Sequence, residues 1–332
     1  MSRFRLRRMR SVHVMIVTIV LLAPATALAV ARVTSAAGQT IPKPLNLQIT
    51  PRRVRFGHAV HVNGWAPASD AGSHVVVYTA PSASDSGATW RPVGQTQIAP
   101  SGRFRLRVVP RRSGLLRAVV DAAGSGPVAH IDATHTVTAA GGAPEPASAS
   151  EPVAVTARFA IARRQFNVLG SGGIKVAGAL LPATSGRSVA LQGHTARGWR
   201  TLTHARTGSR GGFALRYRPA SATGQRLRVL FAGDGNNGRT VGPAGTVTVF
   251  EPSVASWYDD AGQTACGYHA GLGVANRTLP CGTKVTFHYG GRTVHAVVDD
   301  RGPYVGGRDW DLNQNTASAL GFAGVGTVWV SG

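Results

Sequence analysis

Apolar and polar residues alternate along many short stretches of this chain. In Gly102–Val109, "GRFRLRVV", the residues Phe104, Leu106 and Val108 alternate with three arginines, and "GGFALRYRP" at residues 211–219 follows a similar pattern. A period of two places successive side chains on opposite faces of a β-strand. The chain also holds 42 Gly and 19 Pro and shows no long helical pattern. We therefore predict a mainly β protein of short strands joined by many turns.

Two segments of the chain carry the same series of motifs. The stretches "VHVNGW", "WRPVGQTQ" and "LRAVV" are followed later, in the same order, by "IKVAGA", "WRTLTHAR" and "LRVLF". Trp90 and Phe104 are fourteen residues apart, and so are Trp199 and Phe213. This self-similarity indicates a repeated structural unit of about 100 residues. Both tryptophans could stack on sugar rings, but we expect them in the cores of their units.

These patterns predict how the chain divides into domains. With 332 residues it is long enough for two or three. We expect immunoglobulin-like β-sandwiches at residues 43–137 and 153–251, without the cysteine pair of antibody domains. A linker rich in Ala, Pro and Ser joins them at residues 138–152. A further domain is expected at residues 253–332.

The N-terminal segment has the features of an export signal. The opening "MSRFRLRRMR" carries five Arg, an apolar run follows, and Ala27-Leu28-Ala29 offers small residues for cleavage. We predict a signal peptide at residues 1–29 and a tether at residues 30–42. An uncleaved anchor is the alternative, because Val12–Ala31 is free of charge and nearly long enough to span a bilayer. Either way the protein is expected outside the cytoplasm, secreted or associated with the cell wall.

The formal net charge of +22 is unevenly distributed along the chain. Residues 253–332 hold five basic and six acidic residues, so the positive charge belongs to the part before them. Outside the cell this charge favours peptidoglycan or another anionic wall glycan as the partner, and not nucleic acid. The alternative is that the arginines reflect genomic base composition and only solvate the strands. We expect a monomer, with membrane contact only through an uncleaved N-terminal segment.

The chain has two cysteines, Cys266 and Cys281. In an exported protein a nearby pair forms a disulfide more often than a zinc site, since two thiolates alone make an incomplete zinc shell. A bridge of this length would stabilise the fold by about 3 kcal/mol. Two free thiols are the alternative. His269, His288 and His295 show no metal-ligand spacing, and we expect neither a metal nor a cofactor.

The last quarter of the chain contains "ASWY", "TLPCGT", "DRGPY" and "GRDWDL" in that order. From Ser253 to Val330 it resembles the double-psi β-barrel of rare lipoprotein A-like proteins and, more distantly, expansin, barwin and kiwellin domains. The resemblance implies a closed six-stranded barrel with a groove across one face. In some relatives it also implies lytic transglycosylase activity on peptidoglycan.

Residue patterns in this quarter agree with a compact barrel. Short strands are expected at residues 284–289, 292–298 and 326–330. One helix is expected within "NQNTASALG", with Asn313 as its N-terminal cap and Gly321 ending it.

The resemblance places Asp300 in the groove, and we take it as the candidate acid/base. A lytic transglycosylase protonates the departing glycosidic oxygen while the sugar's own 6-hydroxyl closes an anhydro ring, so one carboxyl can give and then take a proton. Asp299 and Asp300 are adjacent on a strand and should point to opposite faces. Asp259, where many relatives have Gly, could act as a second acid and favour the protonated form of Asp300. Two carboxylates at a suitable separation would also permit ordinary hydrolysis.

A second set of residues is expected to bind substrate. Its members are aromatic or polar and lie in the same motifs: Trp257, Tyr258, Asn276, Arg301, Tyr304 and Asp311. Trp257 and Tyr258 should alternate, one as a sugar platform in the groove and the other in the core. Asn276 stands where lytic members of the family usually place His, and an amide cannot exchange a proton.

Each of these residues also has a non-catalytic interpretation. Asp300 could simply accept backbone hydrogen bonds in its turn, Arg301 could pair with Asp309 or Asp311, and Asp311 could brace the barrel. The leading hypothesis is a secreted cell-wall protein that cleaves peptidoglycan glycan strands through its C-terminal barrel. The rival is a wall-binding protein of expansin type or a barwin-like inhibitor, without turnover.

Overall fold

A computed structural model describes residues 45–82, 90–121, 148–221, 223–259 and 262–332. Within them almost all regular structure is β-strand, with one short α-helix, so the expected mainly β class is confirmed. The predicted signal peptide or anchor, the tether and most of the predicted linker lie outside the described residues. Among the residues described, no helix is both long and apolar enough to cross a membrane.

The first repeat, residues 45–156, consists of two sheets around one hydrophobic core. One sheet has the order β1-β3-β6, and the other pairs β2 with β8, then β7, β4 and β5. The strands are β1 (Asn46–Thr50), β2 (Arg53–Arg55), β3 (Val60–Trp65), β4 (His74–Ala80), β5 (Arg91–Gln97), β6 (Arg103–Val108), β7 (Gly114–Asp121) and β8 (Glu151–Thr156). A single 3₁₀ turn, η1, covers Ala68–Asp70.

Alternation along these strands builds the core as the sequence pattern predicts. In β6, Phe104 and Val108 are buried while the three arginines are exposed. β3 likewise buries Val60 and Val62. Val153 and Val155 of β8 also belong to this core, so the strand that follows the expected linker completes the first repeat.

The second repeat, residues 157–250, has the same plan. One sheet has the order β14-β11-β9, and the other pairs β13, β12, β15, β16 and β10 in turn. The strands are β9 (Arg158–Ile161), β10 (Arg164–Leu169), β11 (Ile174–Leu181), β12 (Ser188–Thr195), β13 (Gly198–Arg206), β14 (Gly212–Tyr217), β15 (Gln225–Gly233) and the first part of β16 (Gly238–Tyr258). A separate apolar core lies between the two sheets.

The repeated tryptophans occupy equivalent environments, but not the one expected. Arg117 lies over the ring of Trp90 at 5.6 Å, and Arg228 lies over the ring of Trp199 at 4.1 Å. Both rings are half-buried and belong to neither hydrophobic core. The expectation of core tryptophans was therefore wrong. A guanidinium over each ring stabilises it at the surface by a cation–π contact.

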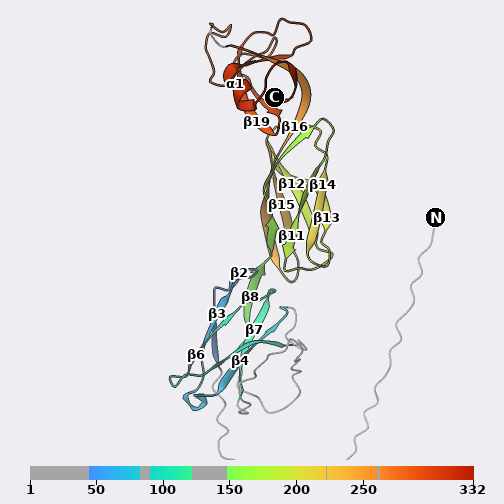
Figure 1. The fold of residues 1–332 in the computed structure, drawn as a ribbon. Helices are drawn as coiled ribbons and strands as arrows, with labels where there is room; N and C mark the ends of the chain where they lie inside the picture. The colour runs from blue at the N-terminus through green and yellow to red at the C-terminus, as the bar shows by residue number, and fades with distance from the viewer. Residues whose placement is uncertain (1–44, 83–89, 122–147, 222, 260–261) are drawn as a thin grey trace, which may run out of the picture. The chain divides into compact units, whose positions relative to one another are not determined.

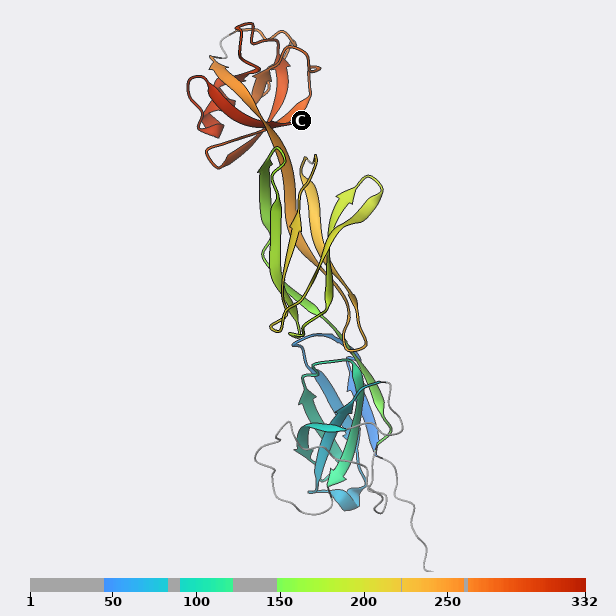
Figure 2. The same cartoon turned by 90° about the vertical axis from the view of Figure 1, so that its right-hand side faces the viewer.

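The C-terminal barrel, residues 251–332, is a ring of six paired strands and is drawn in orange to red in Figures 1 and 2. The end of β16 pairs with β21, and the pairing continues through β18, β19, β17 and β20 back to β16. The strands are β17 (Gly273–Ala275), β18 (Lys284–Tyr289), β19 (Arg292–Asp300), β20 (Trp310–Asn313) and β21 (Gly326–Ser331). Pairing around the ring is uneven, because β17 and β20 share only two residue pairs.

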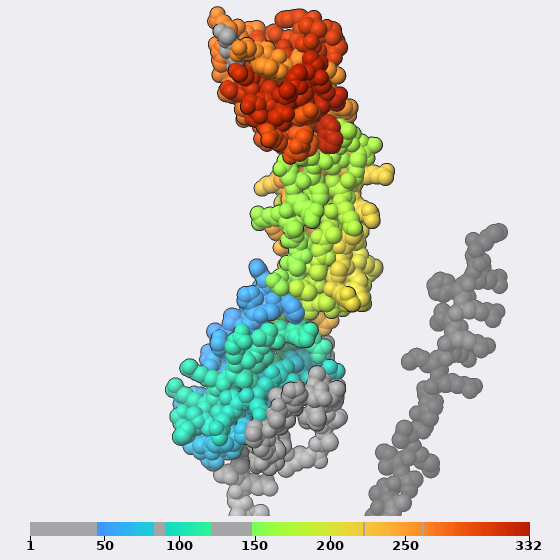
Figure 3. Space-filling model, in the orientation of Figure 1, coloured from blue at the N-terminus to red at the C-terminus, as the bar shows by residue number. Residues whose placement is uncertain are grey.

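One helix, α1 (Gln314–Leu320), packs on the barrel. Asn313 caps it by accepting a hydrogen bond from the Thr316 N–H, and Gly321 ends it in the left-handed conformation. Both expectations for this helix are confirmed. Leu320 and Ala317 join Phe287, Trp310 and other apolar residues in the third core. In the space-filling view the atoms of this domain, orange to red, pack together as one body (Figure 3).

β16 belongs to two of the three cores. Its first part pairs with β15 and β10 of the second repeat. Its last part pairs with β21 and β20 of the barrel. Val247 lies in the second core and Ala255 in the third, and the strand is continuous between them. No spacer therefore separates the second repeat from the last domain.

Candidate active site

Asp299 and Asp300 end strand β19, where the pairing register with β17 shifts between Val298 and Asp300 and interrupts the alternation of buried and exposed residues. Asp299 is completely buried, whereas Asp300 is partly exposed. Oδ1 of Asp300 accepts a hydrogen bond from the Ala265 N–H at 2.7 Å and another from the Arg301 N–H at 2.8 Å. Among the residues that the structure describes, only this oxygen of the Asp300 carboxylate accepts hydrogen bonds. The second oxygen is therefore available to a ligand.

The loop before β17 holds Asp300 from one side. Besides the Ala265 bond, the Tyr268 hydroxyl donates to the Val298 carbonyl at 3.0 Å. The Cys266 N–H donates to the Asp299 carbonyl at 3.3 Å. This one loop thus contacts three consecutive residues at the end of β19. These contacts fix the position of the Asp300 carboxylate relative to the barrel.

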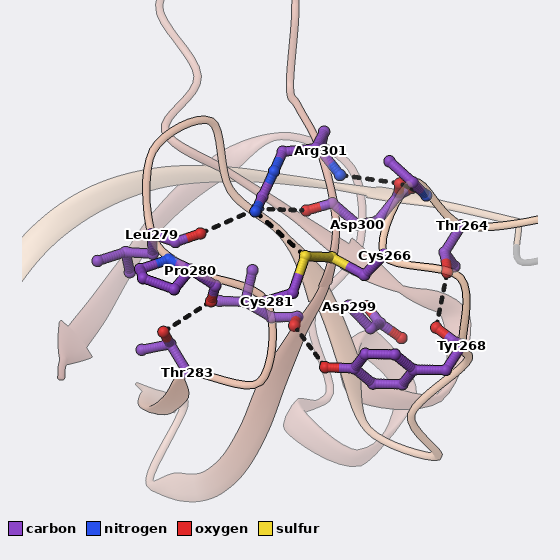
Figure 4. Close-up of a disulfide and its surroundings, with 12 residues drawn as sticks. Thr264, Cys266, Tyr268, Leu279, Pro280, Cys281, Thr283, Asp299, Asp300 and Arg301 are labelled. Carbon is purple, nitrogen blue, oxygen red and sulfur yellow. Dashed lines mark hydrogen bonds between the residues drawn. A yellow bond between two sulfur atoms is a disulfide. The ribbon is translucent and has the colours of Figure 1, made fainter.

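A disulfide between Cys266 and Cys281 closes this arrangement, as predicted (Figure 4). Cys266 follows Ala265 directly, and Cys281 lies in the "TLPCGT" turn before β18. The bridge therefore ties the loop that donates to Asp300 to the opposite turn of the barrel.

The side chain of Arg301, just after β19, contacts the "TLPCGT" turn and the residues before it. Its Nη1 donates to the carbonyls of Leu279 at 2.9 Å and Asn276 at 3.2 Å. Its Nη2 lies 3.1 Å from Sγ of Cys281. Figure 4 shows the side chain reaching toward Leu279 and the disulfide. Its guanidinium thus contacts main-chain carbonyls where the sequence suggested a partner in Asp309 or Asp311.

The main chain of Asn276 is hydrogen-bonded to the main chain of Asp300. Its N–H donates to the Asp300 carbonyl at 3.2 Å. Its side-chain oxygen accepts from the N–H groups of Thr278 at 3.0 Å and Leu279 at 2.9 Å. The amide therefore caps the turn that follows β17, a role for which Asn is well suited.

The arginine that meets Asp309 is Arg277. The two side chains lie 3.8 Å apart, and Nη1 of Arg277 also donates to the carbonyls of Pro303 and Arg308. Hydrogen bonds from the Val254 N–H and the Ser253 hydroxyl lower the pKa of Asp309, with a smaller contribution from Arg277. A carboxylate with a lowered pKa stabilises the fold above its unfolded pKa, and this contribution is lost as the pH falls through the folded value. Asp309 and Arg277 thus act together in holding the loop before β20.

The remaining predicted residues lie around the β16–β20 pair. Asp311 accepts a hydrogen bond from the Ser256 hydroxyl at 2.7 Å across the two strands. Trp257 is 43% exposed, whereas Tyr258 is half-buried with its hydroxyl oxygen out of solvent. Tyr304 is 84% exposed. Asp259 is exposed just after β16, and the two residues that follow it are outside the residues that the structure describes.

No group of three or more potential metal ligands occurs within the part of the chain that the structure describes.

Comparison with known proteins bears on this region of the chain. Residues 252–331 match the family model described as lytic transglycolase. This segment is an RlpA-like domain. Over 99 residues the chain is 39% identical to the "Probable endolytic peptidoglycan transglycosylase RlpA" of a Synechocystis strain. That match covers 27% of this chain and 31% of the relative, so the chain spans about a third of the length of the curated relative it matches.

Similar solved structures include the I-band fragment I67–I69 of titin and the BTLA ectodomain. The titin fragment shares 9% identity at a TM-score of 0.26, covering 87% of this chain and 88% of the fragment. The BTLA ectodomain shares 12% identity at a TM-score of 0.22, covering 29% of this chain and 97% of the ectodomain. At TM-scores this low neither match carries an argument about the fold of the repeats.

The RlpA-like domain also contains a buried polar cluster that sequence reasoning missed. Oδ2 of Asp299 accepts from the Ala270 N–H at 2.8 Å. Nδ2 of Asn313 donates to the Ala270 carbonyl at 3.2 Å, and the Thr316 hydroxyl donates to the Gly273 carbonyl at 3.0 Å. These bonds join the loop before β17, whose Ala265 N–H donates to Asp300, to the start of α1. Strand alternation did not signal this cluster, because Val294, Ala296 and Val298 take the inward positions and Asp299 is buried at the register shift that follows them.

Gly273→Ala is expected to destabilise the RlpA-like domain by about 1–3 kcal/mol, the usual cost of overpacking. A methyl group at Gly273 would collide with the buried carboxylate of Asp299, whose Cγ would lie 2.6 Å away. Gly271→Ala is the matched control, because a methyl group there meets no atom within 4 Å. Hydrogen exchange of peptides from residues 253–332 in the full chain measures the local opening free energy. Equal protection in the two variants would contradict this packing.

Proposed function

We propose that this chain acts outside the cytoplasm as a peptidoglycan lytic transglycosylase, through its C-terminal RlpA-like domain. The observation that carries the proposal is the Asp300 carboxylate, partly exposed and fixed through one oxygen by two main-chain N–H groups. The family match of residues 252–331 supports the reaction class. The named relative supports peptidoglycan as the substrate.

In the proposed reaction Asp300 acts first as an acid and then as a base. Its carboxyl proton passes to the glycosidic oxygen that leaves N-acetylmuramic acid, as the bond to the anomeric carbon breaks. The 6-hydroxyl oxygen of the same sugar bonds to that carbon, and its proton returns to the carboxylate. Atoms and charge balance without water, and one positioned group serves both steps. Because Oδ1 is held by main-chain donors, Oδ2 is the oxygen that we assign to proton transfer.

The neighbouring residues receive supporting roles. Asp259 modulates the carboxyl proton of Asp300, whereas the exposed rings of Trp257 and Tyr304 contact sugar. Asp311 and Asn276 bind sugar hydroxyls. Arg301 orients the turn that borders the site, because its donors are engaged with main-chain carbonyls.

We propose the following organisation for the whole chain. A signal peptide at residues 1–29, or an uncleaved anchor, and a tether at 30–42 precede two immunoglobulin-like sandwiches. The expected linker at 138–152 leads into β8, the last strand of the first sandwich, so the boundary between the sandwiches lies near residue 157 and not at 138–152. The double-psi barrel occupies 253–332. The two-sheet plan of both repeats supports the sandwich assignment. The protein works as a monomer, and its basic repeats keep it close to anionic wall glycan.

Incubation of the mature protein with purified peptidoglycan tests the function. Mass spectrometry of the soluble products should find fragments with 1,6-anhydro ends. Fragments with reducing ends would instead indicate a hydrolase that uses two carboxylates. If no fragments appear over a range of pH and substrate preparations, the enzymatic proposal is wrong.

A second candidate is a wall-binding protein without turnover. Asn276 favours it, because the amide that replaces the family's usual His caps a turn and cannot transfer a proton. This candidate predicts that the protein pellets with insoluble peptidoglycan and releases nothing.

A further inference from the structure

The outer face of the sheet β1-β3-β6 in the first repeat is polar and basic. Its residues alternate with the core residues of the same strands and include no acidic side chain: Asn46, Gln48, Thr50, His61, Asn63, Trp65, Arg103, Arg105 and Arg107. All are exposed except Asn63, which is half-buried. Trp65 is 56% exposed, an unusual position for so large an apolar ring.

Strand register arranges these side chains in three rows across the sheet. The rows are Asn46–Trp65–Arg103, Gln48–Asn63–Arg105 and Thr50–His61–Arg107. Each row ends in an arginine, and the arginines are about 6.8 Å apart along β6, as alternate residues of a strand are. Within the described residues none of the three pairs with a carboxylate. Their charges therefore add along one edge of the sheet.

The rows border two neighbouring hollows. One, of about 310 Å³, is lined by Asn46, Trp65, Arg103 and their neighbours. The other, of about 500 Å³, is lined by Thr50, His61, Arg107 and their neighbours. Asn63 and Arg105 line both, so the hollows follow one another along the strands.

The second repeat shows that the fold does not require this surface. β11 and β14 pair in the same register as β3 and β6, with Gly178 opposite Phe213 as Gly64 is opposite Phe104. The equivalents of Trp65 and Arg103 are therefore Ala179 and Gly212, and those of Asn63 and Arg105 are Ala177 and Ala214. Only the third row stays basic, as Lys175 and Arg216. A uniform bias toward arginine would have affected both repeats alike.

We infer that the outer face of β1-β3-β6 binds an acidic polysaccharide, a linear glycan with ionised carboxylates along its length. Exposed arginines pair with carboxylates in two-pronged hydrogen bonds. Trp65 offers a flat ring for a sugar, and Arg103 lies 5.2 Å from that ring, so stacking and charge coincide. Asn46, Gln48 and Asn63 supply amides for sugar hydroxyls. This inference rests on the proposed function in one respect, the location of the protein outside the cytoplasm, where such a glycan is found. Binding at this face does not require Asp300.

The affinity of the full mature chain for polygalacturonate, an acidic polysaccharide, tests this inference. Dextran, a neutral polysaccharide, is the control polymer. The variant Arg103→Thr, Arg105→Thr, Arg107→Thr keeps strand-forming residues and should bind about tenfold more weakly or worse. The matched control is Lys175→Thr, Arg216→Thr, Arg218→Thr, which removes the same charge from exposed positions of the second repeat. It should retain affinity within about twofold, because it leaves every residue of the proposed surface in place. Equal losses of affinity for polygalacturonate in the two triple variants would contradict a binding site on β1-β3-β6.

Trp65→Ala separates sugar recognition from charge alone. Affinity for polygalacturonate should fall severalfold, whereas affinity for polyphosphate, which has no sugar ring, should not change. Equal effects on both polymers would overturn the glycan assignment. So would tighter binding of a single-stranded DNA oligonucleotide than of polygalacturonate at the same salt concentration. Asp300→Asn should leave all of these affinities unchanged, so loss of catalysis and loss of this site are distinguishable.

Discussion

Asp300→Asn is expected to reduce the release of anhydro-ended fragments about 100-fold or more, the usual contribution of a general acid/base. Asn preserves the oxygen that accepts from Ala265 and Arg301 but carries no transferable proton. The measurement is the initial rate of fragment release from purified peptidoglycan, followed by mass spectrometry. Pelleting with insoluble peptidoglycan should remain as in the unmodified protein, because the shape of the site is retained.

Glu251→Gln is the control for this substitution. It makes the same acid-to-amide change at an exposed position of β16, away from Asp300's contacts, and should leave the rate unchanged. Equal release by the unmodified protein and Asp300→Asn would exclude Asp300 as the acid/base. The chain would then fit the non-catalytic candidate if it still pelleted with the wall.

Cys266→Ser with Cys281→Ser is expected to destabilise the RlpA-like domain by about 3 kcal/mol, because the bridge closes a loop of about 15 residues in the unfolded chain. Catalysis should fall as well, since the loop that donates to Asp300 loses its tie to the "TLPCGT" turn. Hydrogen exchange at residues 262–272 and the rate of fragment release measure the two effects.

The two readouts also separate two roles of the disulfide. Thr283→Ser is a suitable control, because it retains the hydroxyl that donates to the Pro280 carbonyl in the same turn. If the cysteine variant shows faster exchange but unchanged turnover, the bridge only stabilises the fold. Unchanged exchange would contradict the stabilisation.

Residue patterns predicted those parts of the molecule that depend on local rules. The Asn and Gly preferences of helix ends located α1. Strand alternation alone did not show which of Asp299 and Asp300 is buried, because a register shift after Val298 interrupts the alternation and buries Asp299. The cysteine pair was also predictable, because compartment and spacing restrict what two thiols can do.

Contacts with the main chain could not be predicted in the same way. Arg301 binds carbonyls of Asn276 and Leu279, and every residue has a carbonyl, so the sequence favoured a visible acid instead. The repeated tryptophans were expected in the cores because hydropathy does not reveal that an arginine two strands away in the same sheet will cover each ring. Asn276 carried a usable signal, since Asn commonly caps turns, but the family comparison directed attention to the missing His.

The continuous strand β16 couples the unfolding of the second repeat to that of the barrel. Residues 238–258 supply hydrogen bonds to both bodies, so an opening that releases the whole strand removes a ladder from each. A fragment that starts at residue 253 would discard the Glu251 and Pro252 pairings with β21. Isolated barrels intended for enzymology should therefore begin upstream of the family boundary, and calorimetry of the whole chain should show fewer transitions than there are hydrophobic cores.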